Sequence, residues 1–181
     1  MGGVGQARSP FKISNMSKYF EGTFLTVPSK LEDSIPAAKE EFFELAKSRV
    51  KYMSREEFIK WHEEIFGDAI DTPASNLIIK SETGEVENLE IAINNDAFHL
   101  DNKDYTDLIP CVIEHETYEA WIEIKGGAMK KELESGRDEA FLKKHLLAER
   151  NEFLMAEKMG LGEKLFEWRM KIAPEKEVEF R

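Results

Sequence analysis

Ionisable side chains interrupt the apolar face of a predicted helix, and this pattern constrains the fold of the chain more than any other. When residues 108–124 are placed on a helical wheel, their aliphatic side chains gather on one arc, which we expect to face the core. His115, Glu116 and Glu119 lie inside this arc. An unpaired charge at a buried position is costly, so we expect a partner to neutralise these side chains.

A second predicted helix, residues 135–159, carries the same exception. Its apolar arc contains His145, Glu149 and Glu152. If the two arcs pack together, two imidazoles and four carboxylates meet in one apolar pocket. A divalent cation is an economical partner for such a group of side chains.

Two pairs of side chains have a spacing that suits chelation. His115 and Glu119 lie four residues apart and project from one face of their helix, and His145 and Glu149 repeat this spacing. We expect these four side chains to bind a divalent metal ion. The competing interpretation is that the same groups form hydrogen bonds and ion pairs between the helices without a metal.

The region before residue 70 predicts two helices. Apolar residues recur at three- and four-residue spacing between Pro36 and Met53, which predicts one amphipathic helix. Ser54 and Glu57 have the spacing of a capping box, so a second helix is expected to begin there. Gly67 predicts the end of this second helix.

Short strands are predicted around these helices. Residues 77–80 and 88–94 flank a Thr-Gly turn at 83–84, and the second segment alternates aliphatic with other side chains, as in a hairpin. Another short strand is expected at residues 23–27. The predicted fold class is therefore α+β, predominantly helical, with a small antiparallel hairpin or sheet before the helix of residues 108–124.

The length of 181 residues predicts one domain, which we assign to residues 11–173. The glycine-rich residues 1–10 are expected to form a flexible arm, and residues 174–181 a charged tail. The longest apolar runs contain only a few residues, far fewer than the roughly 20 that span a bilayer.

The net charge of the chain limits which partners are expected. The chain carries 36 acidic and 25 basic residues, a net charge of −11. The electrostatic field of this net negative charge repels phosphate backbones and anionic lipids. We therefore expect neither nucleic acid nor a membrane as a partner, and cations are the favoured partners.

The cysteine content and the N-terminal sequence indicate the expected localisation. Cys111 is the single cysteine and cannot form an internal disulfide, and no secretory leader is evident, so we expect a cytoplasmic protein.

Residues 114–120, EHETYEA, resemble the helix motif of zincin metallopeptidases, H-E-x-x-H, with Glu119 in the position of the second histidine. The resemblance covers about residues 76–159, because small zincins also have a hairpin or short sheet before the motif helix and a later helix after it.

The resemblance implies a zinc-dependent hydrolase that cleaves an amide in a peptide or protein. It implies that His115 and Glu119 are zinc ligands and that Glu116 activates water on the metal. His145 or Glu149 on the following helix then completes the ligand set.

Three other classes fit parts of the same pattern. A di-iron or di-manganese helix bundle uses E-x-x-H on two helices, but here Val112 and Leu142 occupy the acidic positions. The E-x-x-E pairs at 116–119 and 149–152 resemble the magnesium-binding helices of nucleotide pyrophosphohydrolases, which leaves the histidines unexplained. A non-enzymatic binding or assembly module would use the ion, or ion pairs alone, to fasten two helices.

The remaining candidates are assigned to structure. We expect His62 to pack in the core or to form a satisfied hydrogen bond, and His99 to lie outside the site. Cys111 is expected to be a core thiol, because its direction on the helix differs from that of His115.

Overall fold

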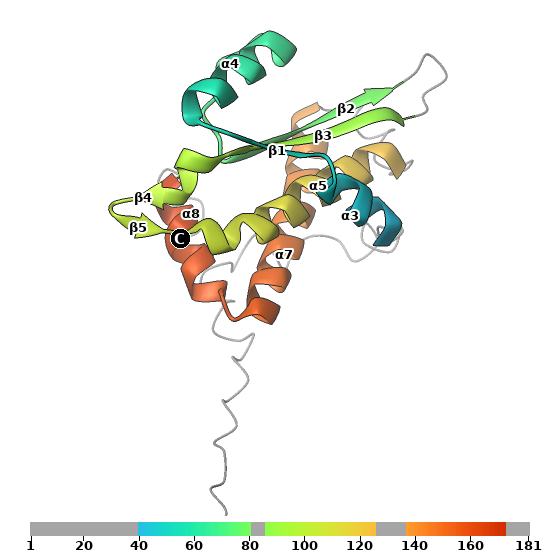
Figure 1. The fold of residues 1–181 in the computed structure, drawn as a ribbon. Helices are drawn as coiled ribbons and strands as arrows, with labels where there is room; N and C mark the ends of the chain where they lie inside the picture. The colour runs from blue at the N-terminus through green and yellow to red at the C-terminus, as the bar shows by residue number, and fades with distance from the viewer. Residues whose placement is uncertain (1–39, 81–85, 126–136, 173–181) are drawn as a thin grey trace, which may run out of the picture.

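The computed structural model of the chain describes residues 40–80, 86–125 and 137–172 (Figure 1). Several predicted features lie outside these ranges: the arm at 1–10, the strand at 23–27, the helix starts at Pro36 and Ser135, the turn at 83–84 and the tail at 174–181.

The described residues form an α+β fold that is mostly helical, as the sequence predicts. Five helices, two 3-10 helices and two small sheets are present among these residues. In chain order the elements are α3 (Glu40–Lys47), β1 (Val50–Met53), α4 (Arg55–Phe66), β2 (Ala74–Lys80), β3 (Val86–Asn94), η1 (Asn95–Phe98), β4 (His99–Leu100), β5 (Lys103–Asp104), η2 (Thr106–Leu108), α5 (Ile109–Lys125), α7 (Arg137–Met159) and α8 (Gly162–Ile172).

The larger sheet has the strand order β1-β3-β2. Strands β2 and β3 are antiparallel, which confirms the predicted hairpin, and β1 runs parallel to β3. The prediction of one continuous helix as far as Met53 is wrong, because Val50 to Met53 form β1. The backbone of this segment pairs with β3 from Ile91 to Asn94, and this long-range pairing overrides the helical spacing of its apolar side chains.

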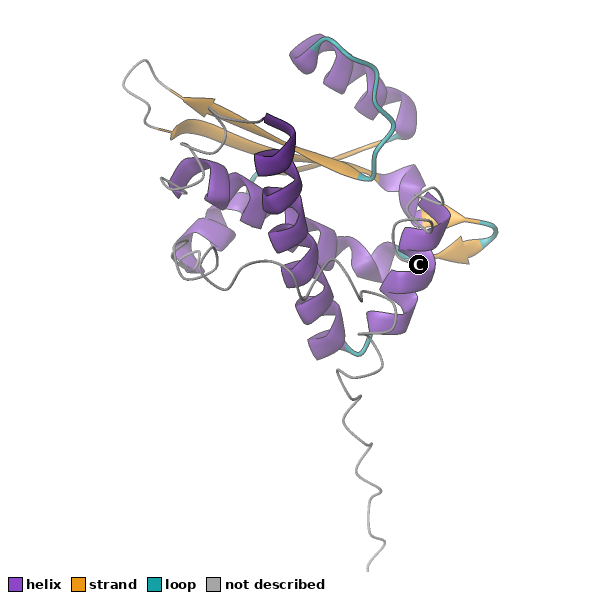
Figure 2. Cartoon of the chain, turned by 180° about the vertical axis from the view of Figure 1, so that it is seen from behind, coloured by secondary structure: helices purple, strands orange, loops and turns teal. Residues whose placement is uncertain are grey.

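Helix α4 begins and ends where the sequence predicts. The Ser54 side chain accepts from the backbone N–H of Glu57, and the Glu57 carboxylate accepts from the backbone N–H of Ser54. Gly67 adopts a left-handed conformation with φ of 83°, which suits glycine because it has no Cβ atom. Figures 1 and 2 place α4 on one side of the three-stranded sheet and the other helices on the opposite side.

The core lies between this sheet and α5. Leu89, Ile91 and Ile93 on β3 are buried, and they join one apolar cluster with side chains of α5, α7 and α8. Helix α8 is fixed by Trp168, whose ring stacks on Phe98 at a centroid distance of 5.0 Å. Its indole N–H also donates to the Ala97 carbonyl at 2.8 Å. The sequence predicts no separate helix here, so α8 is an addition to the predicted fold.

Helices α5 and α7 pack directly against each other and carry the charged side chains that interrupt the predicted apolar arcs. Helix α7 ends at Met159, as the sequence predicts, and Gly160 follows it in a left-handed conformation with φ of 73°. None of the described helices combines the length and the apolar character that crossing a membrane requires.

Candidate metal centre

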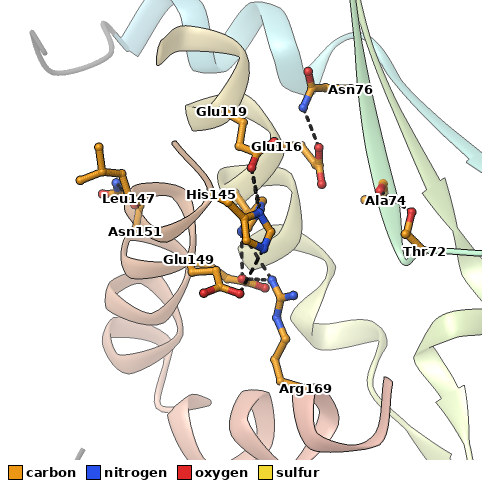
Figure 3. A network of polar contacts seen from close by, with 12 residues as sticks. Thr72, Ala74, Asn76, Glu116, Glu119, His145, Leu147, Glu149, Asn151 and Arg169 are labelled. Carbon is orange, nitrogen blue, oxygen red and sulfur yellow. Dashed lines mark hydrogen bonds and ion pairs between the residues drawn. The ribbon is translucent and has the colours of Figure 1, made fainter. Parts of the chain in front are cut away.

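The contact between α5 and α7 brings His115, Glu119 and His145 together. Each of these residues offers one ligand atom, and the three atoms lie within 4.8 Å of one another. Nδ1 of His145 lies 2.9 Å from Oε1 of Glu119, and Nε2 of His115 lies 3.5 Å from the same oxygen. Figure 3 shows the Glu119 and His145 side chains pointing toward each other from the two helices. The cluster therefore consists of residues that the sequence pattern selects.

The cluster is shielded from solvent on the α5 side and partly open at His145. The side chains of His115 and Glu119 are 4% and 9% exposed, whereas that of His145 is 23% exposed. The two imidazole rings meet edge to face, with centroids 4.9 Å apart. His145 is thus the member of the cluster through which solvent or a small ligand has the best access.

The spacing of the donor atoms fits a small metal ion. Zinc binds imidazole nitrogen and carboxylate oxygen at about 2.0–2.2 Å, so two ligands of a tetrahedral site are separated by roughly 3.4 Å. The two separations to Glu119 Oε1, 2.9 and 3.5 Å, lie on either side of this value. Only small side-chain movements would be needed to accommodate an ion between the three groups.

A carboxylate also faces the far nitrogen of each imidazole. Nε2 of His145 lies 3.3 Å from Oε1 of Glu149, and Nδ1 of His115 lies 3.2 Å from Oε2 of Glu152. Glu149, expected from the sequence to be a ligand, is therefore placed on the side of His145 that faces away from Glu119. The near nitrogens of both rings converge on one carboxylate, and the far nitrogens contact separate ones.

The electrostatics of the two histidines follow from these contacts. Although burial acts to lower it, hydrogen bonds to Glu119 and Glu152 raise the pKa of His115 to about 10. The pKa of His145 is likewise raised, because Glu119 and Glu149 outweigh the effect of burial. Without a metal, the His115 ring is therefore an imidazolium ion at neutral pH, and its contacts with Glu119 and Glu152 are ion pairs.

Glu116 points to a different neighbour. Its Oε2 accepts a hydrogen bond of 2.7 Å from the Asn76 side chain on β2, and Figure 3 shows it directed toward this strand. Burial and the nearby Glu119 carboxylate raise the pKa of Glu116, against the opposing effects of His115 and Asn76. Glu116 is thus a buried carboxyl group beside the cluster, with one polar partner that holds its orientation.

The structure adds two polar residues that sequence reasoning missed. Arg169 on α8 contacts Oε2 of Glu152, and its Nη2 lies 3.4 Å from Nδ1 of His115. Its four-residue spacing from the buried Leu165 was a signal that could have placed it on the inner face of a helix. Asn76 was also missed, although it alternates with Ile78 on a half-buried strand.

The other sequence candidates are separate from the cluster. His62 is buried, and its Nδ1 lies 2.9 Å from the Asp68 carbonyl, which confirms a satisfied hydrogen bond. His99 is exposed in β4. Cys111 is buried, and burial raises the pKa of its thiol to about 11, which confirms a core thiol.

Comparison of the chain with models of known protein families, with curated proteins and with solved structures finds no match. The zincin resemblance therefore stands on the motif residues alone, and the geometry of the cluster has to support any functional proposal.

Proposed function

We propose that the chain binds one divalent transition-metal ion through Nε2 of His115, the Glu119 carboxylate and Nδ1 of His145. The observation that carries this proposal is the convergence of the three donors within 4.8 Å at a buried contact between two helices. Groups of acidic residues on a protein surface are common without an ion. Two imidazoles and a carboxylate that converge at a buried position are, in contrast, a donor set typical of transition-metal sites.

Zinc is the ion that best suits this donor set. Neutral imidazole and carboxylate are zinc ligands, whereas magnesium prefers oxygen ligands and would leave both histidines unused. A paired iron or manganese site needs more carboxylates around two ions, and Glu149 and Glu152 face the far nitrogens of the histidines instead. We therefore propose zinc as the bound ion, with iron and manganese as alternatives that elemental analysis distinguishes. We also propose that the protein is cytoplasmic.

We further propose that the site is hydrolytic and cleaves an amide in a peptide or protein. Two histidines and one glutamate, with a fourth position for water or substrate, form the ligand set of several catalytic zinc sites. When bound, zinc would activate water and polarise the carbonyl. Glu116 would take the proton and deliver it to the leaving group, for which a pKa raised by burial is suitable, and Asn76 would hold its carboxyl group in place.

A second candidate is a structural role, in which the ion or the ion pairs fasten α5 to α7. The burial of His115 and Glu119 favours this role, because closed sites bind metal for folding rather than for turnover. The hydrolytic and the structural role predict the same metal ligands. They differ in that only the hydrolytic role requires Glu116, as the base.

Elemental analysis and a turnover assay test the two steps separately. Protein purified without chelators or added metal should contain close to one zinc per chain, and His115→Ala should remove it. The matched control is His99→Ala, which changes an exposed histidine. Hydrolysis of casein or of a peptide library should then disappear in Glu116→Gln while its zinc content is retained. Zinc without any turnover supports the structural role, and absence of metal from the unmodified protein contradicts both candidates.

A further inference from the structure

A buried acid–base pair lies behind His115, on the side away from the proposed ion. Glu152 on α7 is completely buried, and its Oε2 lies 3.2 Å from Nδ1 of His115. Arg169 on α8 contacts the same oxygen through its Nη2, which also lies 3.4 Å from Nδ1 of His115. A guanidinium only donates, and Nδ1 lies closer to the Glu152 oxygen than to Nη2, so we take this oxygen as the shared acceptor of both N–H groups. One carboxylate oxygen thus serves a histidine from α5 and an arginine from α8.

The ion pair between Glu152 and Arg169 uses only one carboxylate oxygen, which is not the arrangement that gives the most stability. Arginine and carboxylate commonly form two parallel hydrogen bonds, which satisfy both carboxylate oxygens. Among the described residues, however, Oε1 of Glu152 and Nε of Arg169 are buried and have no hydrogen-bond partner. Leaving a buried polar atom unpaired costs free energy, so the single-oxygen contact gives up stability that a two-pronged contact would supply.

The position of the shared Glu152 oxygen, on Nδ1 of His115, indicates a role for it in metal binding by this histidine. A carboxylate on one nitrogen of an imidazole accepts its N–H and leaves the other nitrogen with a lone pair, which is a common arrangement behind metal-binding histidines. Here the other nitrogen, Nε2, is the one that faces Glu119 at 3.5 Å. Arg169 supplies a positive charge that stabilises the buried, negatively charged Glu152 carboxylate.

We propose that Glu152, held by Arg169, is a positioning residue that fixes the proton of His115 on Nδ1 and its lone pair on Nε2. The inference rests on the proposed metal site and extends it to α8, a helix that contributes no ligand. Zinc affinity then depends on the hydrogen-bond acceptor that Glu152 presents to Nδ1 of His115.

Two neutral double variants separate positioning from charge balance. Glu152→Gln/Arg169→Met removes both charges and keeps a carbonyl oxygen that accepts from Nδ1, whereas Glu152→Leu/Arg169→Met also removes the acceptor. Zn²⁺ affinity is measured by competition with a chromophoric chelator. Loss of the acceptor should weaken zinc binding by about tenfold to a hundredfold relative to the glutamine double variant. Equal affinities of the two variants would overturn the inference.

Lys164→Met provides the control for helix docking. Lys164 links α8 to Asp107 at 2.6 Å, so its loss weakens the attachment of α8 without touching the cluster. Zinc affinity should be unchanged in this variant, and a loss as large as that of the leucine double variant would overturn the inference. Absence of zinc binding by the unmodified chain would instead refute the metal site itself, and this inference with it.

A measurement on the unmodified protein covers the case in which the double variants fail to fold. In zinc-loaded protein labelled with ¹⁵N, long-range ¹H–¹⁵N correlation assigns the proton of each imidazole to one nitrogen. The inference predicts that His115 carries its proton on Nδ1 and its metal on Nε2. The opposite assignment would overturn it.

Discussion

Nδ1 of His145 in α7 lies 2.9 Å from Oε1 of Glu119 in α5. This contact joins two helices through a single carboxylate oxygen, which Nε2 of His115 also approaches. The same three groups can share protons, as an ion-pair cluster, or share a metal ion in place of those protons. The two states respond differently to pH, to substitution and to metal removal, so they can be separated by experiment.

The pH dependence of stability should have opposite signs with and without zinc. The pKa of His115 rises from 6.5 to about 10 in the folded, metal-free chain. Its contribution is therefore fully present below pH 6.5 and is lost as the pH rises through 10. Zinc needs the neutral ring, so zinc binding should strengthen with rising pH.

Chemical denaturation across this pH range, with chelator or with zinc, measures both trends. His115→Gln is the control, because it should abolish this contribution in the chelated protein. A chelated protein whose stability does not depend on His115 at any pH would contradict the ion-pair description of the metal-free state.

Glu119→His completes the H-E-x-x-H pattern and should increase turnover per bound zinc. A neutral imidazole donates less negative charge than a carboxylate, so zinc becomes a stronger Lewis acid. The affinity is measured by chelator competition and the activity by peptide hydrolysis at full zinc occupancy. If the variant binds zinc fully and hydrolyses nothing, the site is structural rather than catalytic.

Asn76→Leu should shift the pH–rate profile and lower stability. Removal of the amide leaves the buried Glu116 carboxylate without its 2.7 Å donor, which raises the pKa of Glu116 further and moves the acidic limb to higher pH. The expected loss of unfolding free energy is about 1–3 kcal/mol.

The matched control for Asn76 is Asn88→Leu on the neighbouring strand, because the Asn88 side chain contacts Arg49 and Glu90 rather than Glu116. An identical pH–rate profile in Asn76→Leu and in the unmodified protein would remove Glu116 from the proposed role of base.

Arg169→Met should be far more destabilising than other losses of positive charge from α8. It leaves the completely buried Glu152 without its arginine partner, for which the expected cost is about 3–5 kcal/mol. Lys164→Met breaks an ion pair nearer the surface, worth about 0–1 kcal/mol. Urea denaturation compares the two variants, and adding Glu152→Gln to Arg169→Met should recover most of the loss. Equal costs for both lysine and arginine variants would contradict the burial argument.

The parts of the fold that depend on local sequence could be predicted. The capping box of Ser54 and Glu57, the hairpin of β2 and β3 and the two helices α5 and α7 follow from spacing within short segments. Strand β1 could not be predicted in this way, because its pairing with β3 joins residues about 40 positions apart and competes with a helical pattern.

The candidate site was partly predictable for the same reason. The interruption of two apolar arcs selects His115, Glu119 and His145, because charges on a buried face need partners wherever the face packs. Which atoms face each other depends on side-chain contacts across the fold. The placement of Glu149 on the far nitrogen of His145, the bond from Asn76 to Glu116 and the contribution of Arg169 from α8 therefore required the structure.

The most direct test of the central claim is a crystal structure of the zinc-loaded protein with data collected on both sides of the zinc absorption edge. The account predicts one anomalous peak between α5 and α7, within bonding distance of Nε2 of His115, a Glu119 oxygen and Nδ1 of His145. Absence of a peak at this position, with the imidazoles still bonded directly to Glu119, would contradict it.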